Sequence, residues 1–408
     1  MLRISFNDIL CFAVFIYFVA NIIAGLIPGG KLLIVFSIAL TGLVYINEHG
    51  TKIKTKIKLT TVSYPLYIAC FTLFCFASRF WAVNSDLTIP KINSLLFILI
   101  GMTVISMSLV EKNIDKLLKA IMWGGYFVIF CIVAKYGVSD LLKLMSSGER
   151  ISNELINANT LGICAAYSIV ITFYYTLYDG FKIKYLIMLP TIVIIAVSGS
   201  RKAILILIMG LIGLLILKKI KNESFFKTLV SVFWVVIIAL MAIFIMSRLP
   251  LFALLNERMV KLVDVFFGEA TRYTNDAWIR LAYTKLGLNL FLQNPVLGIG
   301  IANANIYTNM YYGHDHYLHN NYIELLACGG LVGFLFYYSF FIYLLYTFWK
   351  CRQIRDREYD ICVLLLVIHL IMDYGMVTFY DKTNYVFLLL FWLEANKLKD
   401  QCRNILSH

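Results

Sequence analysis

Apolar runs recur from one end of this chain to the other, and most are nearly long enough to cross a lipid bilayer. They measure roughly 13 to 20 residues and are separated by short charged or Gly- and Pro-marked breaks. A helix that spans a bilayer needs about 20 apolar residues and satisfies its own backbone hydrogen bonds. Of the 408 residues, 61% are hydrophobic and only 14% are charged, which is too few to cover a soluble surface. The sequence therefore predicts an all-α, polytopic membrane helix bundle.

We expect about 12 transmembrane helices. Their expected cores are 9–27, 32–46, 62–83, 94–110, 121–136, 161–177, 185–197, 203–217, 229–246, 329–348, 361–376 and 385–395. The first run has no convincing small-residue cleavage site behind it, so we expect it to be an uncleaved anchor.

The distribution of basic residues predicts the orientation in the membrane. With the N-terminus inside, one set of connecting segments carries 21 of the 36 basic residues, whereas the short opposite loops carry seven. Such an excess marks the cytoplasmic side, so both termini are expected in the cytoplasm. The same distribution explains the net charge of +13 without a nucleic-acid partner.

One segment breaks the rhythm of short connections. Residues 247–328 form a polar-rich loop on the outer side, between helices 1–9 in residues 1–246 and helices 10–12 with a cytoplasmic tail in residues 329–408. A loop of this size in a compact chain is usually functional. Within it, apolar residues recur at helical spacing from Ala277 to Leu292, until Asn294-Pro295 interrupts the pattern.

The seventh and eighth expected spans are short, so the turn between them should lie recessed in the membrane. This turn carries Ser198, Ser200, Arg201 and Lys202. An arginine at that depth either faces a wet cavity or an anionic partner, or else extends to the lipid headgroups. Arginine suits a diphosphate because its planar guanidinium presents paired donors and stays charged.

Three of the six histidines, His314, His316 and His319, lie within six residues of the outer loop. One of them as a general base, a metal site and a set of surface histidines are all compatible with this pattern. Glu324 is expected either to take part in acid–base chemistry or to stabilise the start of the following helix. Asn157 and Asn159 are expected to have a structural role at the start of the sixth span.

Three motifs together carry a resemblance to a known family. They are Ser198-Gly199-Ser200-Arg201-Lys202-Ala203, then Asn294-Pro295-x-x-Gly298-x-Gly300, then His319-Asn320-Asn321-Tyr322-x-Glu324-Leu325-Leu326 followed by Gly329-Gly330 and Gly333. In this order they resemble the Wzy/WaaL superfamily of O-antigen polymerases and ligases, most clearly over residues 155–345.

The resemblance implies a GT-C-like membrane glycosyltransferase with one large periplasmic helical loop, in a bacterial plasma (inner) membrane. It implies inverting, metal-independent transfer from an undecaprenyl-diphosphate-linked oligosaccharide, with no cofactor. Arg201 and Arg280 match the two arginines that hold the diphosphate in ligases of that family, and His319 matches their essential histidine. Lys202 is a further candidate diphosphate contact. Candidate glycan contacts are His314, His316, Asn320, Tyr322 and Trp278.

We favour a polysaccharide repeat-unit polymerase over a ligase that transfers finished polymer to lipid A core, because the aromatic tenth span and the Asn320–Leu326 run resemble the polymerases more. A chain-length regulator is then a candidate protein partner. A flippase or other transporter of lipid-linked glycans is the alternative from another class. Transporters usually work through two comparable halves, and a single large outer loop argues against such halves here.

Overall fold

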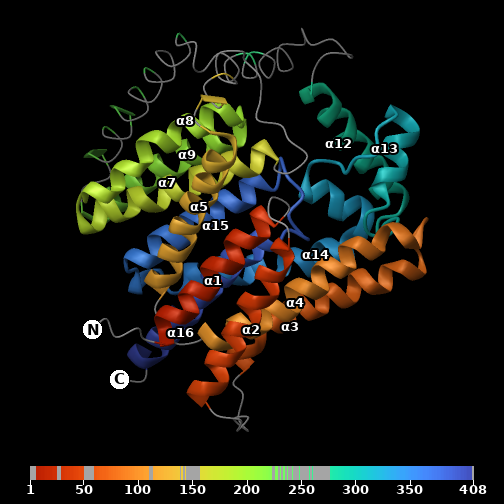
Figure 1. Ribbon diagram of the computed structural model, residues 1–408. Coiled ribbons are helices and arrows are strands. Elements are labelled where there is room, and N and C mark those ends of the chain that lie inside the picture. The colour runs from red at the N-terminus through yellow and green to blue at the C-terminus, as the bar shows by residue number, and fades with distance from the viewer. Residues whose placement is uncertain are drawn as a thin grey trace. The chain divides into compact units, whose positions relative to one another are not determined.

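A computed structural model describes residues 6–24, 29–49, 59–109, 114–137, 139–140, 143, 157–222 and 276–406, with isolated positions between 223 and 275. Within these residues the elements are α-helices and short 3-10 helices, as expected (Figure 1). The α-helices are α1 (Phe6–Ile23), α2 (Gly30–His49), α3 (Leu59–Ala77), α4 (Ile89–Leu109), α5 (Ile114–Tyr136), α7 (Ala158–Asp179), α8 (Met188–Ser198), α9 (Arg201–Asn222), α12 (Asp276–Gln293), α13 (Ala304–Tyr312), α14 (Asn321–Lys350), α15 (Arg357–Met372) and α16 (Lys382–Leu406).

Among the described residues, seven helical stretches are long and apolar enough to cross a membrane, and they lie in or extend α2, α3, α4, α5, α7, α9 and α14. These helices are typical of a multi-pass membrane protein. Eleven of the twelve expected spans overlap a helix. The ninth, 229–246, lies almost wholly outside the described residues, so the count of twelve crossings stays a prediction.

The expected length of the eighth span was wrong. Instead of 203–217, α9 runs from Arg201 to Asn222, and its 22 residues reach about 33 Å. The basic residues from Lys218 onward continue the helix beyond its apolar part. Of the two helices that flank the turn, α8 alone, with 11 residues, is as short as expected for a recessed turn.

α14 begins ahead of 329–348, the expected apolar core of the tenth span. It starts at Asn321, because the Asn320 side chain accepts a hydrogen bond from Ile323 N (3.2 Å) and caps the helix. Glu324 therefore lies in its first turn. The amphipathic helix expected from Ala277 to Leu292 is confirmed as α12.

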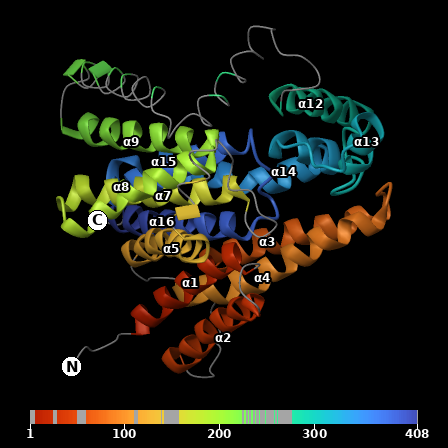
Figure 2. The same ribbon diagram turned by 45° about the horizontal axis from the view of Figure 1, so that its top comes forward.

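The chain forms two compact units. The first contains Met1–Ala39, Asn113–Phe266 and Arg355–Ile368, and the second contains Leu40–Lys112, Phe267–Ile354 and His369–His408. In the first unit, α7 packs against α5, α8 and α9, and α1 packs against α5. Figures 1 and 2 both show α7, α8 and α9 side by side. Small residues allow this close approach: a Cβ on Gly125 of α5 would lie 2.1 Å from Ser168 Oγ on α7.

In the second unit, α3 and α4 form a long pair, and α14 packs against α3, α12 and α16. α13 lies against α12 and α14. The second unit therefore brings α12 and α13, the helices of the loop predicted to lie outside, onto the start of α14.

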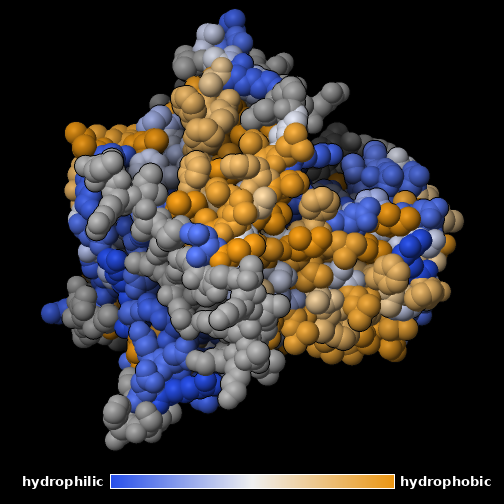
Figure 3. All heavy atoms as spheres, turned by 60° about the horizontal axis from the view of Figure 1, so that its bottom comes forward, coloured by the Kyte–Doolittle hydropathy of each residue, from blue (hydrophilic) through white to orange (hydrophobic). Residues whose placement is uncertain are grey.

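Large apolar side chains are exposed on the spanning helices, among them Leu43 (66%), Leu73 (68%) and Phe130 (64%). On the face shown in Figure 3, hydrophobic residues form a broad area with hydrophilic residues beside it. Apolar surface of this extent is unusual for a soluble monomer and suits contact with lipid.

Candidate functional site

The turn that carries Arg201 lies in the first unit, between α8 and α9. Ser198 ends α8, and Gly199 follows in the left-handed region (φ 58°, ψ 25°). The Ser200 hydroxyl accepts from a backbone N–H in the first turn of α9 (3.4 Å). Arg201 and Lys202, both half-buried, are thus the first two residues of α9, at the end where the backbone N–H groups favour anions.

This turn packs tightly against the beginning of α7. A Cβ on Gly162 of α7 would lie 2.5 Å from Ser198 Oγ and 2.9 Å from Ser200 Cβ. The structural role expected for Asn157 is confirmed, because its side chain caps α7 by accepting from Asn159 N (2.9 Å). The start of α7 thereby supports the Arg201 turn.

In the second unit, α14 is broken at Gly330, whose backbone is not helical (φ 60°, ψ −166°). The segment that follows α12 enters the break and forms four backbone hydrogen bonds with the two halves of the helix. They are Ile299 N to Ala327 O (3.0 Å), Gly300 N to Cys328 O (3.0 Å), Leu331 N to Pro295 O (2.8 Å) and Val332 N to Val296 O (3.1 Å). Backbone groups freed by a break need such partners, because lipid offers none.

This insertion explains the glycines of two of the motifs. Gly298 has φ 67°, and a Cβ there would lie 2.5 Å from the backbone carbon of Cys328. A Cβ on Gly330 would lie 2.3 Å from Val296 O. Both positions need a residue without a side chain, so the Asn-Pro-x-x-Gly-x-Gly and Gly-Gly motifs form one structural joint.

His319 directly precedes α14 in a strained conformation. Its φ of 59° lies in the left-handed region, which residues other than glycine rarely adopt. Its ring lies parallel to the Tyr283 ring (centroids 6.2 Å apart, 7° between planes) and close to the Tyr317 ring (4.3 Å, 52°). Strain of this kind concentrates at functional sites.

Hydrogen bonds from neighbouring elements hold the segment before His319. The Thr308 hydroxyl of α13 donates to His316 O (2.6 Å). Glu324 is almost completely buried (2% exposed), and its Oε2 accepts from Leu318 N (2.8 Å). The carboxylate therefore lies in the first turn of α14, as one expectation held, and it also fixes the backbone next to His319.

Arg280 and Trp278 lie on α12 and are half-buried. Burial raises the pKa of Tyr317, while the charge of Arg280 lowers it and that of Glu324 raises it. Arg280 and Glu324 are therefore both near the Tyr317 hydroxyl, which stays protonated and can donate a hydrogen bond.

His314 and His316 are exposed, unlike His319. Their ring centroids lie 6.1 Å apart, and those of His316 and His319 lie 6.0 Å apart. Across the part of the chain that the structure describes, no three His, Cys, Asp or Glu side chains are gathered as a metal site. The roles of His314 and His316 stay open.

A buried polar network anchors the start of α14 to the segment between α15 and α16. Asn321 N donates to Asp373 O (2.8 Å), and the Asn321 side chain bonds to Asp373 Oδ2 (3.3 Å) and Tyr338 Oη (2.9 Å). The Thr378 hydroxyl donates to Asp373 Oδ1 (2.6 Å). The sequence analysis missed Asp373, although a carboxylate at the end of an apolar span is itself an indication of a functional or positioning role.

The candidate glycan contacts Asn320 and Tyr322 already use their side chains within the protein. Asn320 caps α14, and the Tyr322 hydroxyl donates to Leu370 O (2.6 Å). The Tyr322 ring stacks on Tyr338 (4.8 Å, 13°). Contact of either residue with glycan stays a prediction.

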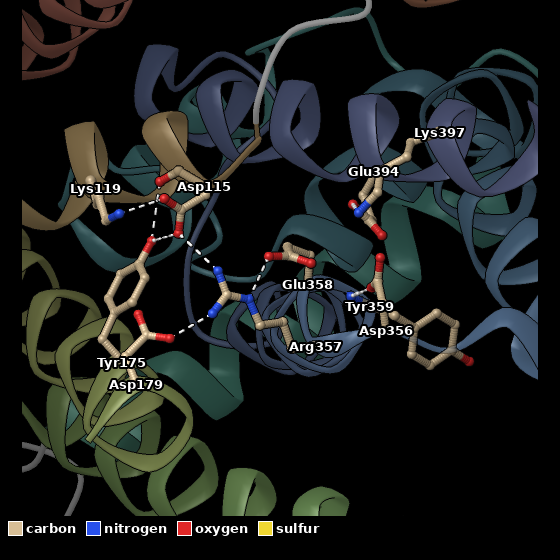
Figure 4. A network of polar contacts seen from close by, with 10 residues as sticks. All are labelled: Asp115, Lys119, Tyr175, Asp179, Asp356, Arg357, Glu358, Tyr359, Glu394 and Lys397. Carbon is tan, nitrogen blue, oxygen red and sulfur yellow. Dashed lines mark hydrogen bonds and ion pairs between the residues drawn. The ribbon is translucent and has the colours of Figure 1, made fainter. Parts of the chain in front are cut away.

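At the end of the first unit away from Arg201, four helix ends meet. Arg357 at the start of α15 pairs with Asp179 at the end of α7 (2.6 Å) and with Asp115 at the start of α5 (3.7 Å), as Figure 4 shows. The Lys218 ammonium of α9 donates to Leu177 O of α7. The charge distribution predicts that the basic segments at these four ends face the cytoplasm, and the network is consistent with one orientation for them.

The chain is a multi-pass helical membrane protein. Its second unit brings together the strained His319, the buried carboxylate of Glu324 and Arg280. Residues 186–338 match a family model described as O-antigen ligase. The match confirms the resemblance to the Wzy/WaaL superfamily, an enzyme family of ligase and polymerase type in lipopolysaccharide biosynthesis. No curated protein matches the chain.

The matched residues include every candidate site residue of the sequence analysis. Arg201 and Lys202 belong to the first unit, whereas Arg280, His319 and Glu324 belong to the second. That Arg201, Arg280 and His319 act on the same lipid-linked donor stays a prediction.

Proposed function

We propose that the protein is a polysaccharide repeat-unit polymerase that acts on undecaprenyl-diphosphate-linked glycan at the outer face of a bacterial inner membrane. It joins one lipid-linked unit to the end of another by inverting, metal-independent transfer. The lipid bilayer is its environment, and a chain-length regulator is a candidate partner.

The observation that carries this proposal is the conformation of His319. The His319 imidazole is held by its strained backbone, by the rings of Tyr283 and Tyr317 and by the capped start of α14. The family model that matches this region is described as O-antigen ligase, which supports glycan transfer. Imidazole titrates near neutral pH, so a fixed, half-buried ring suits a general base.

In the proposed reaction, His319 takes the proton of an acceptor hydroxyl. The acceptor oxygen then bonds to the anomeric carbon as the bond between that carbon and the diphosphate oxygen breaks. The diphosphate leaves with the bonding electrons, and Arg201 and Arg280 stabilise its charge. Attack from the face opposite the leaving group inverts the anomeric centre.

A ligase is the second candidate, because the matching family model is described as O-antigen ligase. Polymerase and ligase need the same donor site and differ in the acceptor, which is either another lipid-linked unit or lipid A core.

Reconstituted protein supplied with lipid-linked repeat units alone tests the proposal. A ladder of longer lipid-linked chains is the result expected of a polymerase. Product that forms only after lipid A core is added identifies a ligase. Movement of intact donor across the vesicle membrane, with no new glycosidic bond, identifies a transporter and overturns the enzyme assignment.

The same assay tests the base. Loss of product in His319→Ala, with milder effects of His314→Ala and His316→Ala and no effect of chelators, is the expected pattern. Comparable loss in all three variants together with inhibition by chelators indicates a metal mechanism instead. If purified His319→Ala retains substantial turnover, the role passes to Glu324, the remaining acid–base candidate.

A further inference from the structure

Lys91 in the first turn of α4 is a cation that the proposed reaction does not yet use. Its ammonium lies 3.6 Å from the centre of the Tyr380 ring, in the segment between α15 and α16. A lysine over an aromatic face points part of its ammonium at the ring, and the N–H donors that point away from the ring can bind another partner.

The buried carboxylate of Glu324 interacts electrostatically with the Lys91 ammonium. The two do not form an ion pair, and Lys91 donates no hydrogen bond to any residue that the structure describes. Its ammonium is thus half-buried and oriented by a ring rather than by a counter-ion.

Lys91 belongs to the same neighbourhood as Arg280. Glu324 acts on Lys91, on Tyr380 and on Tyr317, and Arg280 acts on Tyr317. Two cations, from α4 and α12, therefore lie in one neighbourhood with the buried carboxylate of Glu324 and two phenols, beside His319. Asp381 also acts on Tyr380, and its Oδ1 accepts from Thr383 N (2.9 Å) and from the Thr383 hydroxyl (2.8 Å). Two cations in one neighbourhood suit an anion with more than one charge, such as a diphosphate.

The ordinary alternative for a lysine near the end of a spanning helix is contact with lipid headgroups. The position of Lys91 over Tyr380 and its interaction with the buried Glu324 point instead to the interior of the second unit.

We propose that Lys91 is a further substrate-binding residue that contacts the diphosphate of the lipid-linked donor from the side of α4, together with Arg280. The ammonium supplies a compact charge with rotatable donors, which complements the planar fork of an arginine. This inference rests on the proposed function for the identity of the donor, but its test needs only inorganic pyrophosphate.

Unmodified protein in neutral detergent provides the first test. An amine-acylating reagent is applied with and without saturating pyrophosphate, and each lysine is quantified by mass spectrometry. Pyrophosphate should slow acylation of Lys91 several-fold and leave Lys382 unchanged. Lys382 is a matched internal control, because it also lies over a ring, at 5.8 Å from that of Phe97 in the second unit. Equal protection of both lysines, or of neither, overturns the proposal.

Variants provide the second test. Lys91→Gln should weaken pyrophosphate binding about tenfold, the order expected for one charge-assisted hydrogen bond, whereas Lys91→Arg and Lys382→Gln should bind nearly as the parent protein does. Thermal unfolding of each variant checks that it is folded. If Lys91→Gln binds pyrophosphate with unchanged affinity, Lys91 is not a ligand of the diphosphate.

Nanodiscs distinguish the two sources of phosphate. If phosphatidylglycerol alone protects Lys91 from acylation, the residue is a headgroup contact and the proposal fails. The fate of the proposed function is separate: protein that binds pyrophosphate through Lys91 but transfers no glycan to either acceptor retains this site and loses the polymerase assignment.

Discussion

A side chain at Gly330, where α14 is broken, should destabilise the protein by an amount that follows from the structure. Gly330 has φ 60° and ψ −166°, a region that is nearly exclusive to glycine, so any side chain there costs about 1–3 kcal/mol. In Gly330→Ala the new Cβ would also lie 2.3 Å from Val296 O and 2.6 Å from Leu297 N. These are backbone atoms, so the overlap is relieved only if the inserted segment moves away from α14.

Such a movement breaks the four backbone hydrogen bonds of the joint, each worth about 0.5–1.5 kcal/mol net. With the conformational cost, Gly330→Ala should destabilise the protein by roughly 3–9 kcal/mol. Gly180→Ala is a matched control, because Gly180 has a similar backbone (φ 83°, ψ 163°) but nothing within 4 Å of its Cβ position. It should lose only the conformational part, about 1–3 kcal/mol.

Thermal unfolding of both variants in the same detergent, followed by size-exclusion chromatography, measures the difference. Glycan transfer by the folded fraction then reports whether the joint also positions the site. If Gly330→Ala unfolds at the same temperature as Gly180→Ala, the inserted segment does not hold the two halves of α14, and the reasoning is wrong.

The remaining predictions concern the site and the orientation. His319→Gln should abolish glycan transfer but leave pyrophosphate binding within about twofold, measured on the same preparation. Arg201→Lys and Arg280→Lys should each reduce transfer severely while the protein still inserts, because an ammonium lacks the bidentate fork; near-normal product from either variant would mean that a point charge suffices. Glu324→Gln keeps a side-chain oxygen as acceptor, so substantial transfer is expected if the residue only positions the backbone, and complete loss would assign it the proton. A reporter fused near residue 300 should be active only outside the cytoplasm, and cytoplasmic activity would contradict the topology.

The sequence predicted the elements that depend on local patterns. α12 followed from apolar residues at helical spacing and from the Asn294-Pro295 pair that ends it. The cap at Asn157 followed from its residue type and its position before an apolar run. Both features depend on residues close together in the chain, so the sequence alone predicts them.

Features that depend on distant partners were not predictable in this way. The apolar run of α14 appears continuous, and only the insertion of residues 295–300 shows why Gly330 interrupts it. Asn321 bonds to Asp373, which lies 52 residues later, and that pairing is a property of the packed unit. The end of α9 was misplaced because charged residues leave the membrane without ending a helix.

Several of these distant contacts hold the strained backbone at His319 in place. A left-handed conformation at a residue other than glycine persists only where the surroundings impose it. Here Glu324 holds the backbone on one side through Leu318 N (2.8 Å), and the Asn321 side chain holds it on the other by donating to Asp373 Oδ2 (3.3 Å). Loss of either contact should let the imidazole rotate away from the acceptor without removing any donor-binding cation. Variants of these braces should therefore lower the rate of transfer more than the affinity for diphosphate, and this separates residues that position the base from residues that bind the donor.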